Sequence, residues 1–212
     1  MAASMRLVLA SNNAKKLSEL QALLADTGMT LVAQAALGIE EADEPHFTFI
    51  ENALAKARHA AAAAQGAAVA DDSGLCVAAL GGAPGVISAH YAGELPGVGE
   101  REARRRHQDA ANNALLLQQL QGHADRRADF VSTLVALRHA QDPQPLVAVG
   151  RWPGQILSTA RGELGFGYDP LMLIPELGRT VAELDAVTKN RHSHRARAMA
   201  QLRQLMHEVW RL

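Results

Sequence analysis

Short apolar runs that alternate with helical repeats constrain the fold of this chain more than any other feature. The first run, at 7–10, stops at a polar triplet at 11–13, and leucines at helical spacing follow it until Gly28. Apolar runs at 30–33 and 67–70 are typical of buried strands. Because strands alternate with helices along the chain, we expect an α/β protein.

The rest of the chain continues this alternation. Thr48 and Glu51 match a capping box, in which the two residues satisfy free backbone groups at the start of a helix, so a helix is predicted over 49–63. The remaining expected elements are a helix over 101–121, two or three strands within 128–138 and 146–160, a closing helix with one apolar face, and loops at 80–99 and 162–170.

Length and charge narrow the class of protein. With 212 residues, the chain is long enough for one domain, or for two closely packed lobes, with a sizeable core. A formal net charge of −1 gives no sign of a nucleic-acid or membrane surface. The single cysteine, Cys76, excludes an internal disulfide, and no apolar run has the length of a membrane span. We therefore expect a cytoplasmic protein with neither nucleic acid nor membrane as a partner.

Small polar residues separate the first expected strand from the first helix. Ser11, Asn12 and Asn13 can cap this helix and leave its free N–H groups open to an anion. Lys16 stands in the first turn, where a cation is disfavoured by about 0.3–1 kcal/mol, and a bound phosphate would turn this cost into an attraction. An ordinary helix cap beside a solvated lysine explains the same residues equally well.

Two adjacent aspartates, Asp71 and Asp72, follow the apolar run at 67–70. Neighbouring side chains of a strand point to opposite faces, so the pair can face one way only if the strand ends here, as Ser73 and Gly74 indicate. One carboxylate can then bind Mg²⁺ while the other holds a metal-bound water or a basic side chain, because Mg²⁺ takes one or two carboxylates, waters and phosphates. A turn built on Asp72 is the less favoured alternative.

Two further charged stretches have an ordinary explanation beside a functional one. Lys56 lies on a face of the 49–63 helix that could reach a polyphosphate, although amphipathic surface helices look similar. Carboxylates at 40–44, Glu44 among them, precede this helix, and most residues of such a run are solvated. The arginines at 104–106 are interpreted as a solvated helix face.

Two stretches in the second half of the chain could recognise a base. GFGYDP, at 165–170, places aromatic rings between glycines, where they form a stacking platform for a base or an anchor for a hydrophobic loop. Lys189, His194 and Arg195 cluster where the last helix begins, with Ser193 as its expected N-cap. Donors at this position suit a carbonyl-bearing or anionic ligand, and the basic neighbours argue against a His-x-His metal site.

Together, these motifs resemble those of the inosine-triphosphate pyrophosphatase family, whose members hydrolyse non-standard purine nucleoside triphosphates. The resemblance covers almost the whole chain, through LASNNAKKLSEL, TFIENALAKARHAA, ADDSGLCVAALGGAPGVISAHYAG, GFGYDP and KNRHSHRARA. It implies that water attacks the α-phosphate and yields a nucleoside monophosphate and pyrophosphate, with Mg²⁺ required. It also implies a single domain over 1–212, with a long mixed central sheet flanked by helices, two lobes with the nucleotide cleft between them, and a homodimer.

The resemblance also implies roles for individual residues. Asp72 would be the general base or a metal-bound carboxylate, Asp71 its partner, and Glu44 a second Mg²⁺ contact. The triphosphate would be held by Ser11, Asn12, Asn13, Lys16, Lys56 and Ser73. Phe166 would stack on the base, Gly167, Tyr168 and Asp169 would complete that wall, and Lys189, His194 and Arg195 would recognise the purine edge.

Purine choice would follow from these donors. Hypoxanthine and xanthine present a 6-oxo acceptor to His194 and Arg195, whereas adenine presents an amino group, and a buried donor left unpaired costs about 1–3 kcal/mol. Guanine shares the 6-oxo group, so its 2-amino group has to be refused by another part of the site. Two alternatives stay open: a Maf-like nucleotide pyrophosphatase that prefers another base, and a non-catalytic nucleotide sensor. Pyrophosphate release separates an enzyme from a sensor, and a panel of substrates separates the two enzymes.

Overall fold

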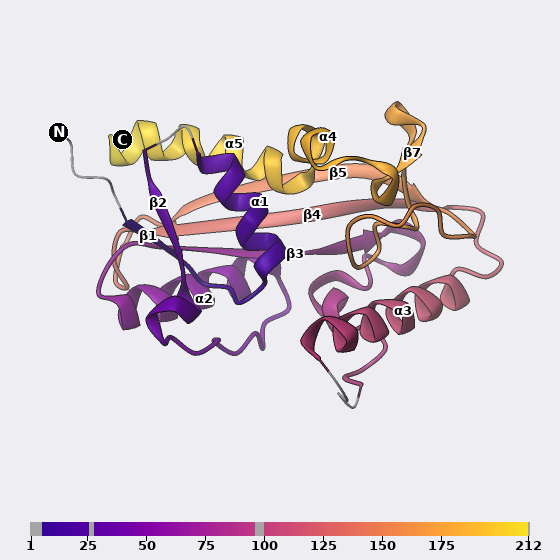
Figure 1. Cartoon of the computed structure of the whole chain (residues 1–212), viewed down its shortest axis with the longest axis horizontal. Helices are drawn as coiled ribbons and strands as arrows, with labels where there is room; N and C mark the ends of the chain where they lie inside the picture. Colours follow the sequence, from indigo (N-terminus) through magenta and orange to yellow (C-terminus); the bar gives the residue numbers. More distant parts are fainter. Residues whose placement is uncertain (1–5, 26–27, 96–99, 212) are drawn as a thin grey trace. The chain divides into compact units, whose positions relative to one another are not determined.

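The structure is a computed structural model, and it describes residues 6–25, 28–95 and 100–211. Within these residues, strands alternate with helices along the chain (Figure 1). The strands are β1 (Arg6–Leu9), β2 (Thr30–Ala33), β3 (Ala68–Val77), β4 (Arg127–Leu137), β5 (Leu146–Ile156), β6 (Met172–Ile174) and β7 (Arg179–Thr180). The α-helices are α1 (Ala14–Leu24), α2 (Phe49–Ala64), α3 (Arg101–Gln119), α4 (Ala186–His192) and α5 (His194–Leu205).

The strands of the described chain form one mixed sheet with the order β2-β1-β3-β4-β5-β6-β7. β1 is parallel to β2 and β3, whereas β6 is antiparallel to β5 and β7. The predicted α/β class, with a mixed sheet and flanking helices, is therefore confirmed. β6 and β7 were not predicted from the sequence, because strands of 3 and 2 residues are too short to show a periodicity.

Contacts within the chain divide it into two compact units. Unit 1 contains Met1–Asp72, Ser132–Arg151 and His192–Leu212, and unit 2 contains Ser73–Val131 and Trp152–Arg191. The single domain and the nucleotide cleft that the sequence predicts stay predictions. In the described ranges, no helix is both long enough and apolar enough to cross a membrane.

Unit 1 buries both faces of its strands, because successive residues alternate between two cores. On one face, Leu7, Leu9 and Val69 pack with leucines and methionines of α1 and α5. On the other face, Val8 and Ala70 pack with alanines of α2. Figure 1 shows α1 and α5 on one side of these strands and α2 on the other. The next two residues of β3 therefore point toward different helices.

Unit 2 has a separate core of aromatic and aliphatic side chains. Trp152 of β5 and Phe130 of β4 are buried with Leu116 of α3 and with Tyr168 from the loop before β6. The hydroxyl of Tyr168 donates a hydrogen bond of 2.9 Å to the backbone oxygen of Ser88. Burial raises the pKa of Tyr168 above its ordinary value. The buried side chain of Tyr168 therefore anchors the 162–170 loop to the core of unit 2.

The two expected helix caps are present. Thr48 Oγ1 accepts a hydrogen bond from the N–H of Glu51 at 3.3 Å and donates one to the Glu51 carboxylate at 2.6 Å. The glutamate therefore bonds the hydroxyl of the cap, whereas a capping box places it on the backbone N–H of Thr48. Ser193 Oγ accepts a bond from the N–H of Ala196 at 3.1 Å and begins α5. The expected loop at 80–99 contains a 3₁₀ turn, and its residues 96–99 lie outside the described part of the chain.

Candidate active site

Asp71 and Asp72 lie in the middle of β3. The expectation that the strand ends after them at Ser73 and Gly74 is wrong, because the strand continues to Val77. The two carboxylates consequently point to opposite faces of the sheet. One meets cations from α1 and α5, and the other meets a cation from α2. Sheet pairing therefore gives the two neighbours different chemical environments.

Asp71 is the buried centre of a charge network in unit 1. Its Oδ2 lies 3.1 Å from Lys16 Nζ and 3.1 Å from Arg195 Nε, and its Oδ1 accepts a 2.7 Å hydrogen bond from Ser132 Oγ. Burial alone would raise the pKa of Asp71, but Lys16 and Arg195 outweigh it and hold the pKa well below its usual range. Arg195 is also paired with Glu19. Asp71 is thus a permanent anion that positions two cations.

Asp72 has a different environment, although it is buried as well. Its Oδ1 accepts a 3.0 Å hydrogen bond from Lys56 Nζ, and its Oδ2 is buried without any hydrogen-bond partner in the described residues. Burial raises the pKa of Asp72 to about 6, against the attraction of Lys56. A buried acceptor without a partner costs free energy of folding, so this oxygen is available to a ligand such as a water or a cation.

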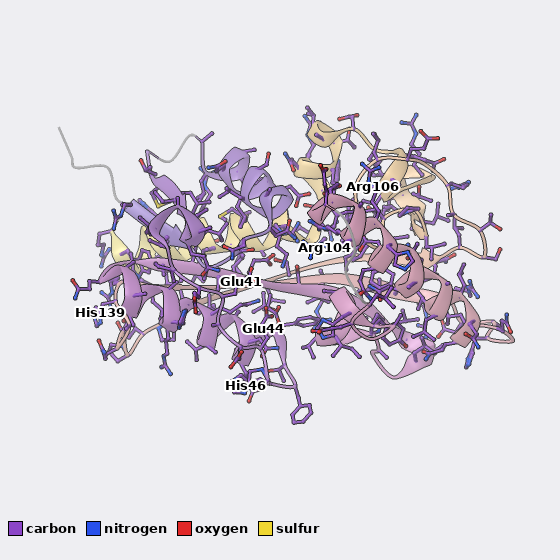
Figure 2. The ribbon with its side chains drawn as sticks, turned by 60° about the horizontal axis from the view of Figure 1, so that its bottom comes forward. Glu41, Glu44, His46, Arg104, Arg106 and His139 are labelled. Carbon is purple, nitrogen blue, oxygen red and sulfur yellow. The ribbon has the colours of Figure 1, made fainter. Side chains whose placement is uncertain are left out.

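Lys56 of α2 lies within hydrogen-bond distance of three acceptors. Its Nζ is 2.8 Å from Glu44 Oε2, 3.0 Å from Asp72 Oδ1 and 3.2 Å from the backbone oxygen of Asp71. Burial alone would lower the pKa of Lys56, but Asp72 and Glu44 outweigh it and raise the pKa. Glu44 comes from the segment before α2, where Figure 2 labels it. Lys56 is therefore a fixed cation that joins two carboxylates.

Few side chains around Asp72 could bind a divalent cation. Among the residues that the structure describes, no three His, Cys, Asp or Glu side chains gather closely enough to hold a metal ion. Asp72 offers its unpartnered oxygen, and Glu44 approaches the same lysine with a carboxylate that is 46% exposed. Two carboxylates suit Mg²⁺, which completes its shell with waters and substrate phosphates. Both oxygens of Asp71 are already bonded, so Asp71 does not fit this role.

The polar triplet before α1 forms the predicted cap. Asn13 Oδ1 accepts a hydrogen bond of 3.2 Å from the backbone N–H of Lys16, and Ser11 Oγ accepts one of 3.2 Å from the N–H of Asn13. The N–H of Asn12 donates to Glu41 Oε1 at 3.3 Å. A carboxylate oxygen therefore occupies the backbone donor of the residue just before the helix cap.

The start of α5 contributes to the Asp71 network. Gly150 of β5 makes this close packing possible, because a Cβ at that position would lie 1.9 Å from the backbone oxygen of His194. Arg195 is only 2% exposed and points at Asp71, and His194 is buried in the same unit. Arg195 thus pairs with two carboxylates of unit 1, those of Glu19 and Asp71. The predicted contact of both residues with a purine base stays a prediction.

Phe166 lies in a loop of unit 2 whose conformation is fixed. Gly165 and Gly167, on either side of it, have φ angles of 79° and 61°, which favour glycine. A Cβ on Gly165 would also lie 2.1 Å from Asp169 Oδ2. That oxygen accepts hydrogen bonds from the N–H of Phe166 at 3.0 Å and from Lys189 Nζ at 2.9 Å. Five of the predicted base-site residues, Phe166, Gly167, Tyr168, Asp169 and Lys189, therefore lie in this loop or on the lysine bonded to it.

Two cations lie at the ring of Phe166. Lys189 Nζ and Arg105 Cζ are each 4.6 Å from the ring centroid. The interpretation of the arginines at 104–106 as a solvated face is wrong for Arg105, which is half-buried against the ring. Arg104 and Arg106, its neighbours on α3, are exposed (Figure 2). Helical spacing alone gives no sign that one of three consecutive arginines turns inward.

Several contacts of the site have little signal in the sequence. Ser132 stands out only as a hydroxyl in an otherwise apolar strand, where a buried polar group needs a partner. Glu19 and Glu41 resemble ordinary surface carboxylates. Ser73, which was predicted to contact the triphosphate, is half-buried on β3 directly after Asp72. Its predicted role stays a prediction.

The model of the Ham1 family matches residues 7–205 of this chain. A curated protein of Methylibium petroleiphilum named dITP/XTP pyrophosphatase is 68% identical over 206 residues, which are 97% of this chain and 99% of that protein. A protein of the same name from Leptothrix cholodnii is 65% identical and covers 98% of this chain and 100% of its own length.

Solved structures of Ham1 proteins are also similar to this chain. A HAM1 protein from Coxiella burnetii superposes with a TM-score of 0.86 at 40% identity, over 97% of this chain and 100% of that one. The Ham1 protein of Staphylococcus aureus gives a TM-score of 0.81 at 35% identity, over 96% and 98% of the two chains.

Proposed function

Because the chain belongs to the Ham1 family, we propose that it hydrolyses non-standard purine nucleoside triphosphates (ITP, dITP and XTP) to the nucleoside monophosphate and pyrophosphate. The observation that carries this proposal is the buried Oδ2 of Asp72, which has no hydrogen-bond partner among the residues that the structure describes and belongs to a carboxyl whose pKa is about 6. The names of the curated relatives support the substrate class.

Asp72 supplies the base of the reaction. Water attacks the α-phosphorus, the bond from this phosphorus to the bridging oxygen breaks, and pyrophosphate leaves, while Oδ2 of Asp72 accepts a proton from the water. With a pKa of about 6, Asp72 is mostly ionised at neutral pH and still basic enough to accept this proton. Lys56 holds the other oxygen and orients the carboxylate. Mg²⁺ held by Glu44 and the substrate phosphates would supply charge neutralisation, and Asp72 Oδ2 is left for the attacking water, because an oxygen bound directly to the ion could not accept its proton.

The loop before α1 and two lysines bind the triphosphate in this proposal. Hydrolysis of a phosphoanhydride needs charge neutralisation and positioning more than covalent chemistry, and Lys16 and Lys56 supply two positive charges. The side chains of Ser11, Asn12 and Asn13 add hydrogen-bond donors beside the helix N-terminus. Ser73 is assigned to the same group of contacts.

The loop at 165–169 and its lysine bind the base. Phe166 stacks on the purine, and Lys189 donates to the 6-oxo group that distinguishes hypoxanthine and xanthine from adenine. Gly167 and Asp169 shape the wall beside the ring, and Tyr168 anchors it to the core. The assignment of His194 and Arg195 to the purine edge remains part of the proposal. A buried donor that faces the amino group of adenine would lose about 1–3 kcal/mol.

Two further properties belong to the proposal. The resemblance to the family implies a homodimer, which sedimentation analysis of the purified protein tests through a mass twice that of the chain. A cytoplasmic location rests on the single cysteine of the sequence.

Hydrolysis of ITP in water labelled with heavy oxygen tests the point of attack. Attack at the α-phosphorus places the label in IMP and leaves the released pyrophosphate unlabelled. Label in inorganic phosphate or in pyrophosphate would reject the proposed reaction. Tight binding of ITP without any hydrolysis would instead indicate the nucleotide sensor.

A further inference from the structure

One face of α3 holds the loop that carries Phe166. Arg105, Asp109 and Asn113 are spaced by four residues and therefore share this face. Asp109 Oδ2 accepts a 2.9 Å hydrogen bond from the N–H of Gly167, and Asn113 Nδ2 donates a 3.0 Å bond to the backbone oxygen of Gly167. Both backbone groups of the residue after Phe166 are thus fixed to the helix, and the ring is held beside Arg105.

Cations and carboxylates both lie near the Phe166 ring. The two cations, Arg105 and Lys189, lie 4.6 Å from the centroid of the Phe166 ring. Two carboxylates bond the loop: Asp169 accepts hydrogen bonds from the N–H of Phe166 and from Lys189 Nζ, and Asp109 accepts one from the N–H of Gly167. A base that stacks on this ring therefore comes within a Debye length, about 8–10 Å, of the charge of Arg105, whereas the charge of Lys189 is shared with Asp169.

We propose that Arg105 is a specificity-determining residue of this chain, which favours a purine base that carries a negative charge. Xanthine has two oxo groups and loses a ring proton near neutral pH, whereas hypoxanthine, adenine and guanine remain neutral there. Arg105 therefore favours XTP over ITP once the xanthine base has ionised. This inference rests on the proposed function, because it requires that Phe166 stacks on the base.

Replacing Arg105 with glutamine tests the inference, because R105Q removes the charge and keeps a polar side chain of moderate length. We measure kcat/KM for XTP and for ITP, with Mg²⁺, at pH values below and above the ionisation of the xanthine base. Above this ionisation, the ratio of XTP to ITP should fall about twofold, as expected for two unit charges about 8 Å apart in water, which is the 4.6 Å from Arg105 to the ring plus one stacking distance. Below it, the ratio should change little.

Two further variants separate charge from structure. R104Q removes a charge from the exposed neighbouring residue of α3 and should leave the ratio at the wild-type value. R105K keeps the charge and should retain most of the preference for XTP. A second measurement, calorimetric binding of XMP and IMP without metal, should show weaker binding of XMP to R105Q and unchanged binding of IMP.

Each contrary result overturns the inference. An equal loss for XTP and ITP would mean that Arg105 only supports the loop, and an R105K enzyme that behaves like R105Q would exclude a role for its charge. A wild-type ratio in R105Q at every pH would exclude any role in specificity. Failure of the proposed function is distinguishable from all of these, because the wild-type protein would then release no pyrophosphate from either nucleotide.

Discussion

Asp71 and Asp72 are neighbours on β3, and their pKa values are shifted in opposite directions. Both carboxyls are buried, and burial raises both pKa values. Asp71 meets Lys16 and Arg195 with one oxygen and Ser132 with the other, and these partners outweigh burial. Within the described part of the chain, Asp72 bonds Lys56 with one oxygen and has no hydrogen-bond partner at the other, so burial prevails. One carboxylate therefore stabilises the site, and the other remains available for chemistry.

Replacement of Asp72 with asparagine should lower kcat for ITP by about 10²–10⁴-fold, which is the usual loss when a positioned base is removed. The amide keeps an acceptor for Lys56, so the site should remain folded. Pyrophosphate release at saturating ITP measures the effect. Asp125→Asn, at an exposed ion pair with Arg127, is the matched control and should retain wild-type turnover. Near-full turnover of Asp72→Asn would exclude Asp72 as the base.

Replacement of Asp71 with asparagine should affect stability more than any direct step of catalysis. It leaves Lys16 and Arg195 without their shared carboxylate, and breaking a buried pair in this way costs about 3–5 kcal/mol. Urea denaturation at neutral pH measures the free energy of unfolding. Ser132→Ala removes one hydrogen bond of the same carboxylate and should cost about 1–3 kcal/mol. An Asp71→Asn protein as stable as Ser132→Ala would contradict the network.

The two aspartates should also act on stability with opposite signs. The folded pKa of Asp71 lies below its ordinary value of 3.8, so its stabilising contribution is present above pH 3.8 and is lost as the pH falls further. The folded pKa of Asp72 is raised from 3.8 to about 6, so its contribution is present below pH 3.8 and is lost as the pH rises through about 6. Denaturation of the two asparagine variants across this range separates these effects.

The pH dependence of kcat/KM should fall on the acid side near pH 6, because protonated Asp72 cannot accept a proton from water. Lys56 lowers the pKa of Asp72 by its charge, so Lys56→Met should move this acid limb to higher pH. The same variant should lower kcat, since it removes a cation from the triphosphate site. Arg58→Gln, on the exposed face of α2, should leave the limb in place. An unmoved limb in Lys56→Met would contradict the assignment of the limb to Asp72.

Removal of Mg²⁺ by a chelator should abolish pyrophosphate release, and added Mg²⁺ should restore it. Glu44→Gln should raise the Mg²⁺ concentration needed for half-maximal activity by about 10-fold or more, as losses around metal sites commonly do. Glu40→Gln, in the same acidic run, should leave that concentration unchanged. If Glu40→Gln raised it and Glu44→Gln did not, Glu44 would be excluded as the metal contact.

The parts of this molecule that local chemistry determines could be predicted from the sequence. Thr48 and Ser193 begin helices as expected, because a cap needs only a hydroxyl and a backbone N–H three residues later. The extent of β3 could not be predicted in this way. Ser73 and Gly74 favour a turn locally, but pairing within the sheet extends the strand through them.

The partners of the charged residues could not be predicted either. Arg195 is 124 residues from Asp71 and 176 from Glu19 in the chain, and no local pattern encodes contacts over such separations. Arg105 is a similar case, because its position against Phe166 depends on how α3 packs on the loop. The residue types of the site could thus be predicted from the sequence. The different roles of Asp71 and Asp72 could not, because they depend on which side chains the fold places beside each carboxylate.

Pyrophosphate release from ITP, dITP, XTP, ATP and GTP, each with Mg²⁺ and with a chelator, tests the central claim most directly. The account predicts rapid, metal-dependent release from ITP, dITP and XTP and little from ATP and GTP. Equal release from all five nucleotides, or a preference for ATP or GTP, would contradict it.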